Sequence, residues 1–188
     1  MVKVGMVFED PGETTEVLAT PDETGDRYRV RLTVTPGGGP GIRGFGPHTH
    51  PGLVEIFQCV SGTMTARLGR QISNLEPGDR LEVSPGIVHG FKNTGEEPLI
   101  VYVDMVFTPP GPRPEADLMA IGVAIAGLIR DGKASRWTGF PPMLQFAVIG
   151  EARPEAMKFT GIAGLLMPSL AALGRLRGYR STFPEYDE

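Results

Sequence analysis

Three histidines and one glutamate have the residue types and spacing that suit metal chemistry. His48 and His50 lie two residues apart, Glu55 follows five residues later, and His89 comes from a separate segment. Positions two apart on a strand point to the same face, so the first two imidazoles are expected to share a face. Three imidazoles and a carboxylate suit one borderline divalent ion: iron, manganese, nickel, copper, cobalt or zinc.

Glu55 is out of step with the two nearby histidines, because its position is odd where theirs are even. The intervening Pro51–Gly52 pair interrupts a strand, and we expect a bend there to return the carboxylate to the same face. His89 must then come from a later strand across the fold. The alternative is a set of hydrogen-bonded groups without metal, but burying three imidazoles and a carboxylate without a cation is costly.

The elements that would position these residues are short strands. The chain has 188 residues, of which 26 are glycine and 18 proline, and it has no period-three repeat, which favours many turns. Alternation of apolar and polar residues predicts seven strands: Arg27–Thr35, Leu53–Val60, Thr63–Leu68, Gln71–Leu75, Leu81–Val83, Ile87–Phe91 and Leu99–Phe107. Seven or eight strands at this spacing indicate an antiparallel sandwich or a small barrel.

The pattern changes after a proline-rich stretch. Residues 108–114 contain four prolines and are predicted to be an extended connector. A helix is expected at Leu118–Arg130, and Pro154–Glu155 resembles another helix start. The division is therefore a β-domain at residues 1–107, the connector at 108–114, and a helical extension at 115–188.

The extension carries apolar residues at helical spacing. They are Ile162, Leu165, Leu166, Leu170 and Leu173, and a break or kink is expected at Pro168. The uncharged stretches of the extension are 12 and 13 residues long, well below the roughly 20 residues that a membrane span requires. We expect these helices to pack on the sheet or at a subunit interface. Peripheral membrane contact is the alternative.

Composition excludes several classes of protein. The net charge of −4 and the absence of a basic half argue against nucleic-acid binding. One cysteine rules out an intrachain disulfide framework and a cysteine-rich zinc site. The N-terminal residues do not form a signal peptide, because acidic residues interrupt the apolar run, so a cytoplasmic location is expected.

Residues 28–107 resemble the cupin superfamily. Its first motif, H-x-H-x4-E-x6-G, is matched by His48, His50, Glu55 and Gly62, and the end of its second motif by Gly86, His89 and Asn93. Two loop positions depart from the pattern: Ile42 replaces a leading glycine, and Ser84 replaces a proline that here comes one residue later. The resemblance implies a small antiparallel β-barrel, a metal held by His48, His50, Glu55 and His89, and a homodimer. It implies no particular substrate.

Strand parity predicts a mostly apolar pocket around the metal. Counting from Glu55 turns Phe57 and Cys59 inward, and counting from His89 turns Ile87 and Phe91 inward. Apart from Ile87 these are expected to line the substrate pocket, together with Val101 and Met105 of the apolar face of Leu99–Phe107 and with Tyr28, which is expected to reach the substrate. Such a pocket favours a small apolar or aromatic ligand that reaches the metal through one or two oxygens. The other interpretation of each side chain is ordinary barrel core.

These features favour a metal-dependent enzyme of the dioxygenase or oxidoreductase type. No acid or lysine beyond the ligands is clearly placed as a general base, and Glu55 is the candidate proton shuttle. Two alternatives stay open: an oxygen-independent isomerase, decarboxylase or hydrolase that uses Lewis-acid polarisation, and a non-catalytic cupin that binds a small ligand.

Overall fold

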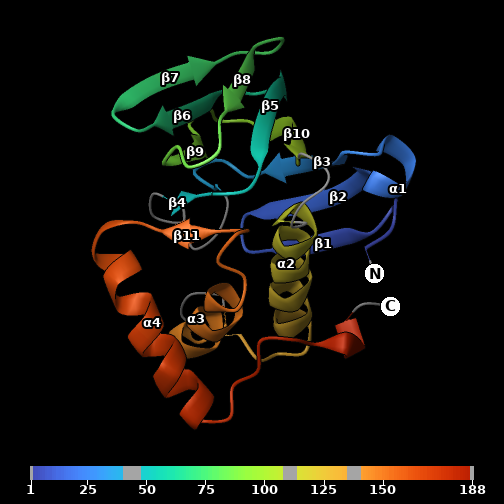
Figure 1. Cartoon of the computed structure of the whole chain (residues 1–188). Coiled ribbons are helices and arrows are strands. Elements are labelled where there is room, and N and C mark those ends of the chain that lie inside the picture. Colours follow the sequence, from blue (N-terminus) through green and yellow to red (C-terminus); the bar gives the residue numbers. More distant parts are fainter. Residues whose placement is uncertain (1, 40–47, 108–113, 135–140, 187–188) are drawn as a thin grey trace.

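Two antiparallel sheets form a β-barrel at one end of the molecule, as the cupin resemblance implies (Figure 1). The computed structural model describes residues 2–39, 48–107, 114–134 and 141–186. In spatial order the larger sheet contains β1 (Val7–Asp10), β2 (Glu13–Ala19), β3 (Arg27–Val34), β10 (Leu99–Val106), β5 (Val54–Ser61) and β8 (Arg80–Val83). The smaller sheet contains β11 (Lys158–Phe159), β4 (His48–Thr49), β9 (His89–Asn93), β6 (Met64–Leu68) and β7 (Gln71–Leu75).

One apolar core joins the two sheets. The alternating side chains Val30, Leu32 and Val34 of β3 are buried in it, and Met64 and Ala66 of β6 meet them from the smaller sheet. This alternation is the period of two that the sequence shows. Strands β1 and β2, which the sequence analysis does not predict individually, extend the larger sheet beyond β3.

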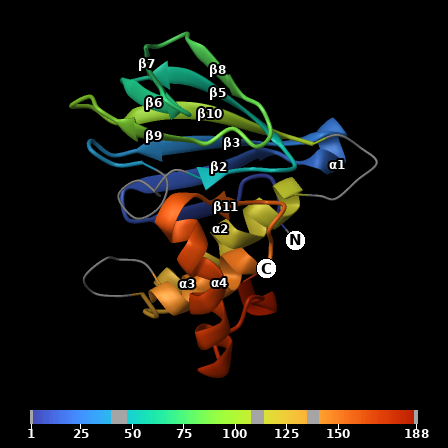
Figure 2. The same cartoon turned by 60° about the vertical axis from the view of Figure 1, so that its left-hand side comes forward.

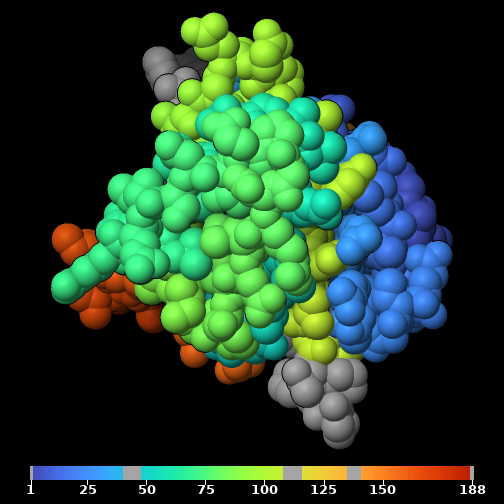
Figure 3. Space-filling view, turned by 90° about the horizontal axis from the view of Figure 1, so that it is seen from above, coloured from blue at the N-terminus to red at the C-terminus, as the bar shows by residue number. Residues whose placement is uncertain are grey.

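The longer helices lie together on one side of the barrel. They are α2 (Pro114–Arg130), α3 (Met143–Glu151) and α4 (Gly161–Leu176), followed by the 3-10 turn η2 (Pro184–Tyr186), whereas the short helix α1 (Pro21–Thr24) lies beside β3. In Figure 2, α2, α3 and α4 lie below the strands, and α2 runs beside β1. Figure 3 shows the opposite face, where the strands and the N-terminal segments dominate the surface. Among the described residues, no helix is long and apolar enough to span a bilayer.

Three sequence expectations about these elements are wrong. Pro154–Glu155 lies in a turn and starts no helix. Strand β9 begins at His89, because Ile87 N donates to Ser84 O and closes a turn that leaves Ile87 42% exposed. Helix α4 has no break at Pro168, since packing against α3 outweighs the local cost of one missing hydrogen bond, and the kink stays a prediction. The predicted connector lies outside the described residues apart from Pro114, which begins α2.

The apolar stripe predicted on α4 is mostly exposed. Ile162, Leu165 and Leu166 are 77%, 79% and 53% exposed, whereas Met167, Ala171 and Gly174 are the buried residues of the helix. A Cβ on Gly174 would lie 2.7 Å from Leu144 O and 2.6 Å from Val148 Cγ2, so glycine permits the close approach of α3 and α4. The stripe therefore does not pack on the sheet, and the subunit-interface alternative stays a prediction.

Helical and β-segments are more closely joined than the predicted division suggests. The extension has its own buried cluster, which includes Ile125 and Phe146. However, Leu118 packs against both this cluster and the barrel core, and β11 pairs with β4. The boundaries at 107 and 115 stay a prediction.

Asn93 fixes one end of the barrel through three hydrogen bonds. Its Nδ2 donates to Val34 O at 2.9 Å and to Glu97 O at 2.8 Å, while its Oδ1 accepts from Gly95 N at 2.9 Å, all in a residue with 0% exposure. We expect Asn93→Ala to lower the free energy of unfolding in urea by about 2–4 kcal/mol, because the mutation leaves buried backbone groups unpaired. The control is Asn74→Ala, which removes an exposed hydrogen bond to Thr65. Equal stability of the two variants would contradict the assignment.

Candidate metal centre

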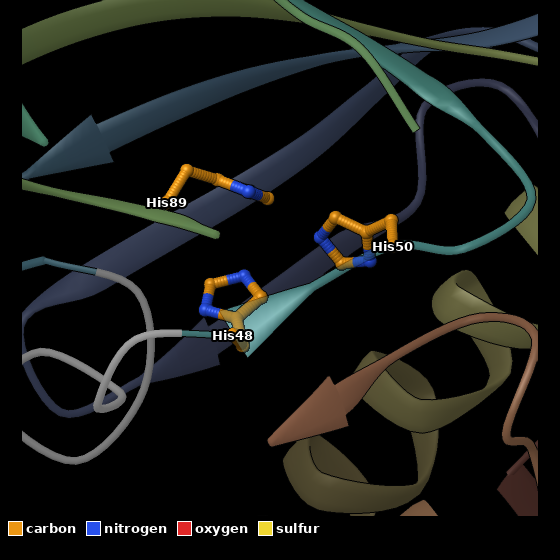
Figure 4. Close-up of side chains that lie close together, drawn as sticks. All are labelled: His48, His50 and His89. Carbon is orange, nitrogen blue, oxygen red and sulfur yellow. The ribbon is translucent and has the colours of Figure 1, made fainter. Parts of the chain in front are cut away.

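Three histidines from the smaller sheet converge between the two sheets. His48 on β4 lies directly opposite His89 on β9, and His50 follows the end of β4. Figure 4 shows the three imidazoles grouped around one space. Their ring centroids are 4.6–5.1 Å apart, and one nitrogen from each ring lies within 4.8 Å of the others. All three side chains are buried, so they are grouped in a site shielded from bulk water.

Glu55 reaches this group from the opposite sheet. Its Oε2 lies 2.7 Å from His89 Nε2 and 3.4 Å from His50 Nε2. The chain bends at Pro51–Gly52 and then enters β5, which belongs to the larger sheet. The carboxylate therefore faces the histidines across the barrel. It reaches them because β5 lies in the opposite sheet, and not because the bend returns it to the face of the strand that carries His48.

Hydrogen bonds from two of the histidines set which nitrogen faces the centre. His89 Nδ1 donates to Ile87 O at 2.9 Å, and His50 Nδ1 donates to the Ala156 carbonyl of the helical extension. With each Nδ1 acting as donor, Nε2 is left as the available ligand atom, which is how partners behind a metal ligand orient it. The extension therefore takes part in orienting His50.

The charges of the group favour an ionised carboxylate. Burial alone would raise the pKa of Glu55, but His50, His89 and His48 together hold that pKa well below its ordinary value. Burial lowers the pKa of His89, but its contact with the Glu55 carboxylate outweighs burial and raises that pKa overall. Glu55 Oε2 and His89 Nε2 are both buried and form no aligned hydrogen bond with a described residue. Three imidazoles and this carboxylate fit a divalent first-row transition metal.

The centre opens into a mostly apolar cavity of about 190 Å³. Its lining includes the four residues of the centre together with Phe57, Phe91 and Met105, which the sequence places in the pocket. Tyr28, Cys59 and Val101 do not line it, because they are buried in the packed barrel core.

Sequence reasoning missed two parts of this cavity. Helix α2 covers it with Leu118, Met119 and Ile125, and Met157 of the extension also lines it. The uncharged stretch of α2 indicated that the helix is buried, but it did not indicate that the helix covers this cavity. Asp10 and Glu13 also line the cavity, although no acid beyond the ligands was expected to have a clear place there. Nothing in their local pattern indicates this position.

One protein-family model and several solved structures are similar to part of this chain. The family model described as "Cupin domain" matches residues 30–107. No curated protein matches the chain significantly. Similar solved structures include a double-stranded β-helix protein from Klebsiella pneumoniae, with 25% identity, 55% of this chain and 84% of that chain covered, and a TM-score of 0.45. A predicted oxalate decarboxylase from Thermotoga maritima shares 18% identity over 57% of this chain and 99% of its own, with a TM-score of 0.48.

The match to the family model covers the strands that carry the four residues of the centre and both sequence motifs. Both motifs and the converging histidines are thus found in the segment that the family model matches. Residues 30–107 of this chain therefore form a cupin domain.

Proposed function

We propose that the chain is a metal-dependent enzyme of the oxygenase type that acts on a small, largely apolar or aromatic substrate bearing oxygen. The observation that carries this proposal is a group of three histidines and one glutamate that opens into an apolar cavity. His48, His50, Glu55 and His89 would hold the metal. When bound, a redox-active metal would supply polarisation of a substrate oxygen and reactivity toward dioxygen.

The protein's own residues would bind and shield the substrate. Phe57, Phe91 and Met105 offer apolar contact beside the centre, and α2 covers the cavity and limits the entry of water. Glu55 would exchange a proton with the substrate, and the distances of its Oε2 from His89 Nε2 (2.7 Å) and His50 Nε2 (3.4 Å), which put the carboxylate at the centre, support this role. Asp10 and Glu13 also line this cavity.

Oxygen uptake by the metal-loaded protein tests this proposal. The protein is isolated anaerobically, loaded in turn with iron, manganese, nickel and copper, and mixed with a panel of aromatic and enolic compounds. We expect uptake with at least one compound and its loss in His89→Ala. Turnover without uptake would replace the proposal with Lewis-acid catalysis. If a compound binds tightly but is not turned over with any of the metals, the protein is a non-catalytic cupin that binds a small ligand.

The homodimer and the cytoplasmic location stay predictions. Size-exclusion chromatography with light scattering measures the first directly. A strictly monomeric protein over the micromolar range would contradict it.

A further inference from the structure

Two carboxyl groups lie along the same cavity, away from the histidines. Asp10 and Glu13 are directly opposite each other at the end of the β1–β2 hairpin, across a turn formed by Pro11 and Gly12. Gly12 has a φ of 105°, which this turn requires and which side chains other than glycine rarely adopt. The hairpin therefore holds both carboxyl groups at one place on the cavity wall.

Glu13 is buried without a strong partner. The residue is only 9% exposed, and its Oε2 forms no hydrogen bond with any described residue. Oε1 accepts only a long hydrogen bond of 3.4 Å from Thr15 Oγ1. Asp10 Oδ1 is likewise buried and unpaired, and among the described residues no lysine or arginine forms an ion pair with either acid. Such groups are costly in a folded protein unless something else binds them.

The protonation of this pair suits it to hydrogen bonding. Burial, and then the neighbouring Asp10 charge, raise the pKa of Glu13 to about 8, despite the hydrogen bond from Thr15. Burial raises the pKa of Asp10 to about 6. At pH 7 the pair therefore carries close to one proton and one charge. Its carboxylate can accept a hydrogen bond from a ligand hydroxyl or pair with an ammonium group.

The cavity lining between this pair and the histidine centre is apolar. Glu13 faces Val34 on β3, which faces Leu99 on β10, whereas Glu55 faces Met105 on the same β10 strand. Glu13 and Glu55 are therefore six residues apart along the strand direction of the sheet, or about 20 Å at ~3.3 Å per residue. Val30, Leu32 and Val103 line the cavity between them. A ligand that touches both ends must be elongated and apolar in its middle.

We propose that Asp10 and Glu13 form a second polar subsite of the cavity, which binds the hydroxyl or ammonium end group of an elongated apolar ligand. The oxygen-bearing head of this ligand would lie at the histidine centre. This second statement rests on the proposed function, whereas the subsite itself rests on the hairpin acids.

Straight-chain acids with and without a terminal donor test the subsite. The probes are unsubstituted, ω-hydroxy and ω-amino carboxylic acids of six to twelve carbons, titrated into the metal-loaded full-length protein by calorimetry at pH 7. At one chain length we expect the ω-hydroxy and ω-amino acids to bind at least tenfold more tightly than the unsubstituted acid. If substituted acids gain no affinity at any length, the proposal is wrong.

Double variants at Asp10 and Glu13 assign the effect to the pair. Asp10→Leu/Glu13→Leu should abolish both preferences, and Asp10→Asn/Glu13→Gln, which removes both ionisable groups, should keep the preference for the hydroxyl but lose that for the ammonium. Glu96→Gln, which changes an exposed carboxyl outside the cavity, should keep both. A preference that survives in Asp10→Leu/Glu13→Leu would overturn the proposal. If this variant does not fold, retention of the ammonium preference in Asp10→Asn/Glu13→Gln would overturn it instead.

The same titrations separate this proposal from the proposed function. In His89→Ala we expect weaker binding of every acid, because the carboxylate head loses its site, with the ω-preference unchanged. If His89→Ala binds all acids as wild type does, the assignment of the head to the centre fails while the subsite stands. If wild type shows no ω-preference but depends on His89, the subsite fails alone.

Discussion

His89→Ala is expected to weaken metal binding by more than about 100-fold, since losing even an outer hydrogen-bond partner of a ligand costs roughly 10–100-fold. His89 contributes one nitrogen of the three-histidine group, and its Nε2 lies 2.7 Å from Glu55 Oε2. Removing the imidazole therefore deletes one ligand and leaves the buried carboxylate with fewer neighbours. Affinity for Co²⁺ and Ni²⁺, measured by competition with a chelator, checks this without any assay of activity.

A matched control separates metal binding from general damage to the strand. Phe91→Leu changes the next inward residue of β9, which lines the same cavity but offers no ligand atom. We expect this variant to bind metal as the wild type does. If His89→Ala retains wild-type affinity and a native circular dichroism spectrum, the four residues are not the metal site.

Glu13→Gln is expected to change how stability depends on pH. The pKa of Glu13 is about 8 in the folded protein against an ordinary value of 4.5, so between these values the folded state holds a proton that the unfolded state has released. The free energy of unfolding must then fall as pH rises through this window, by an amount of the order of a few kcal/mol. The variant lacks this titration, so it should match the wild type near pH 5 and exceed it near pH 8.5.

Urea unfolding at several pH values measures this difference. Both proteins are kept in excess chelator, so that the pH dependence of metal binding does not contribute. All other ionisable residues are common to the two proteins, so their contributions cancel in the comparison. Glu96→Gln, with an exposed carboxyl, should follow the wild type. Parallel curves for wild type and Glu13→Gln would show that Glu13 is not held in its protonated form.

Much of the barrel follows from local pattern. The alternation in residues 27–35 predicts β3 as a half-buried strand, and β5, β6, β7, β8 and β10 lie within a residue or two of their expected positions. Turn residues mark where these strands end, as at Gly62, whose φ of 83° follows β5. These features depend on neighbours a few positions away, so the sequence shows them directly.

Local pattern is weaker where packing decides which face is buried. On α4 the large apolar residues suggested the buried face, but the small residues Ala171 and Gly174 face α3 because they permit a closer approach. At the start of β9, a turn closed by Ile87 N outweighs the alternation that predicted a strand two residues earlier. On α4 the contacts with α3 change the outcome, whereas at β9 a hydrogen bond between residues three positions apart does so.

For the candidate site, the spacing of His48, His50, Glu55 and His89 was enough to single out the four residues and the family. Only the tertiary structure shows that Glu55 faces the histidines from the opposite sheet, that Ala156 of the extension orients His50, and that α2 covers a cavity bordered by Asp10 and Glu13. The physical reason is range. Residue type and spacing encode ligand chemistry and strand period, whereas the cavity is made by sheets and helices whose contacts join residues up to about a hundred positions apart, as His50 and Ala156 do.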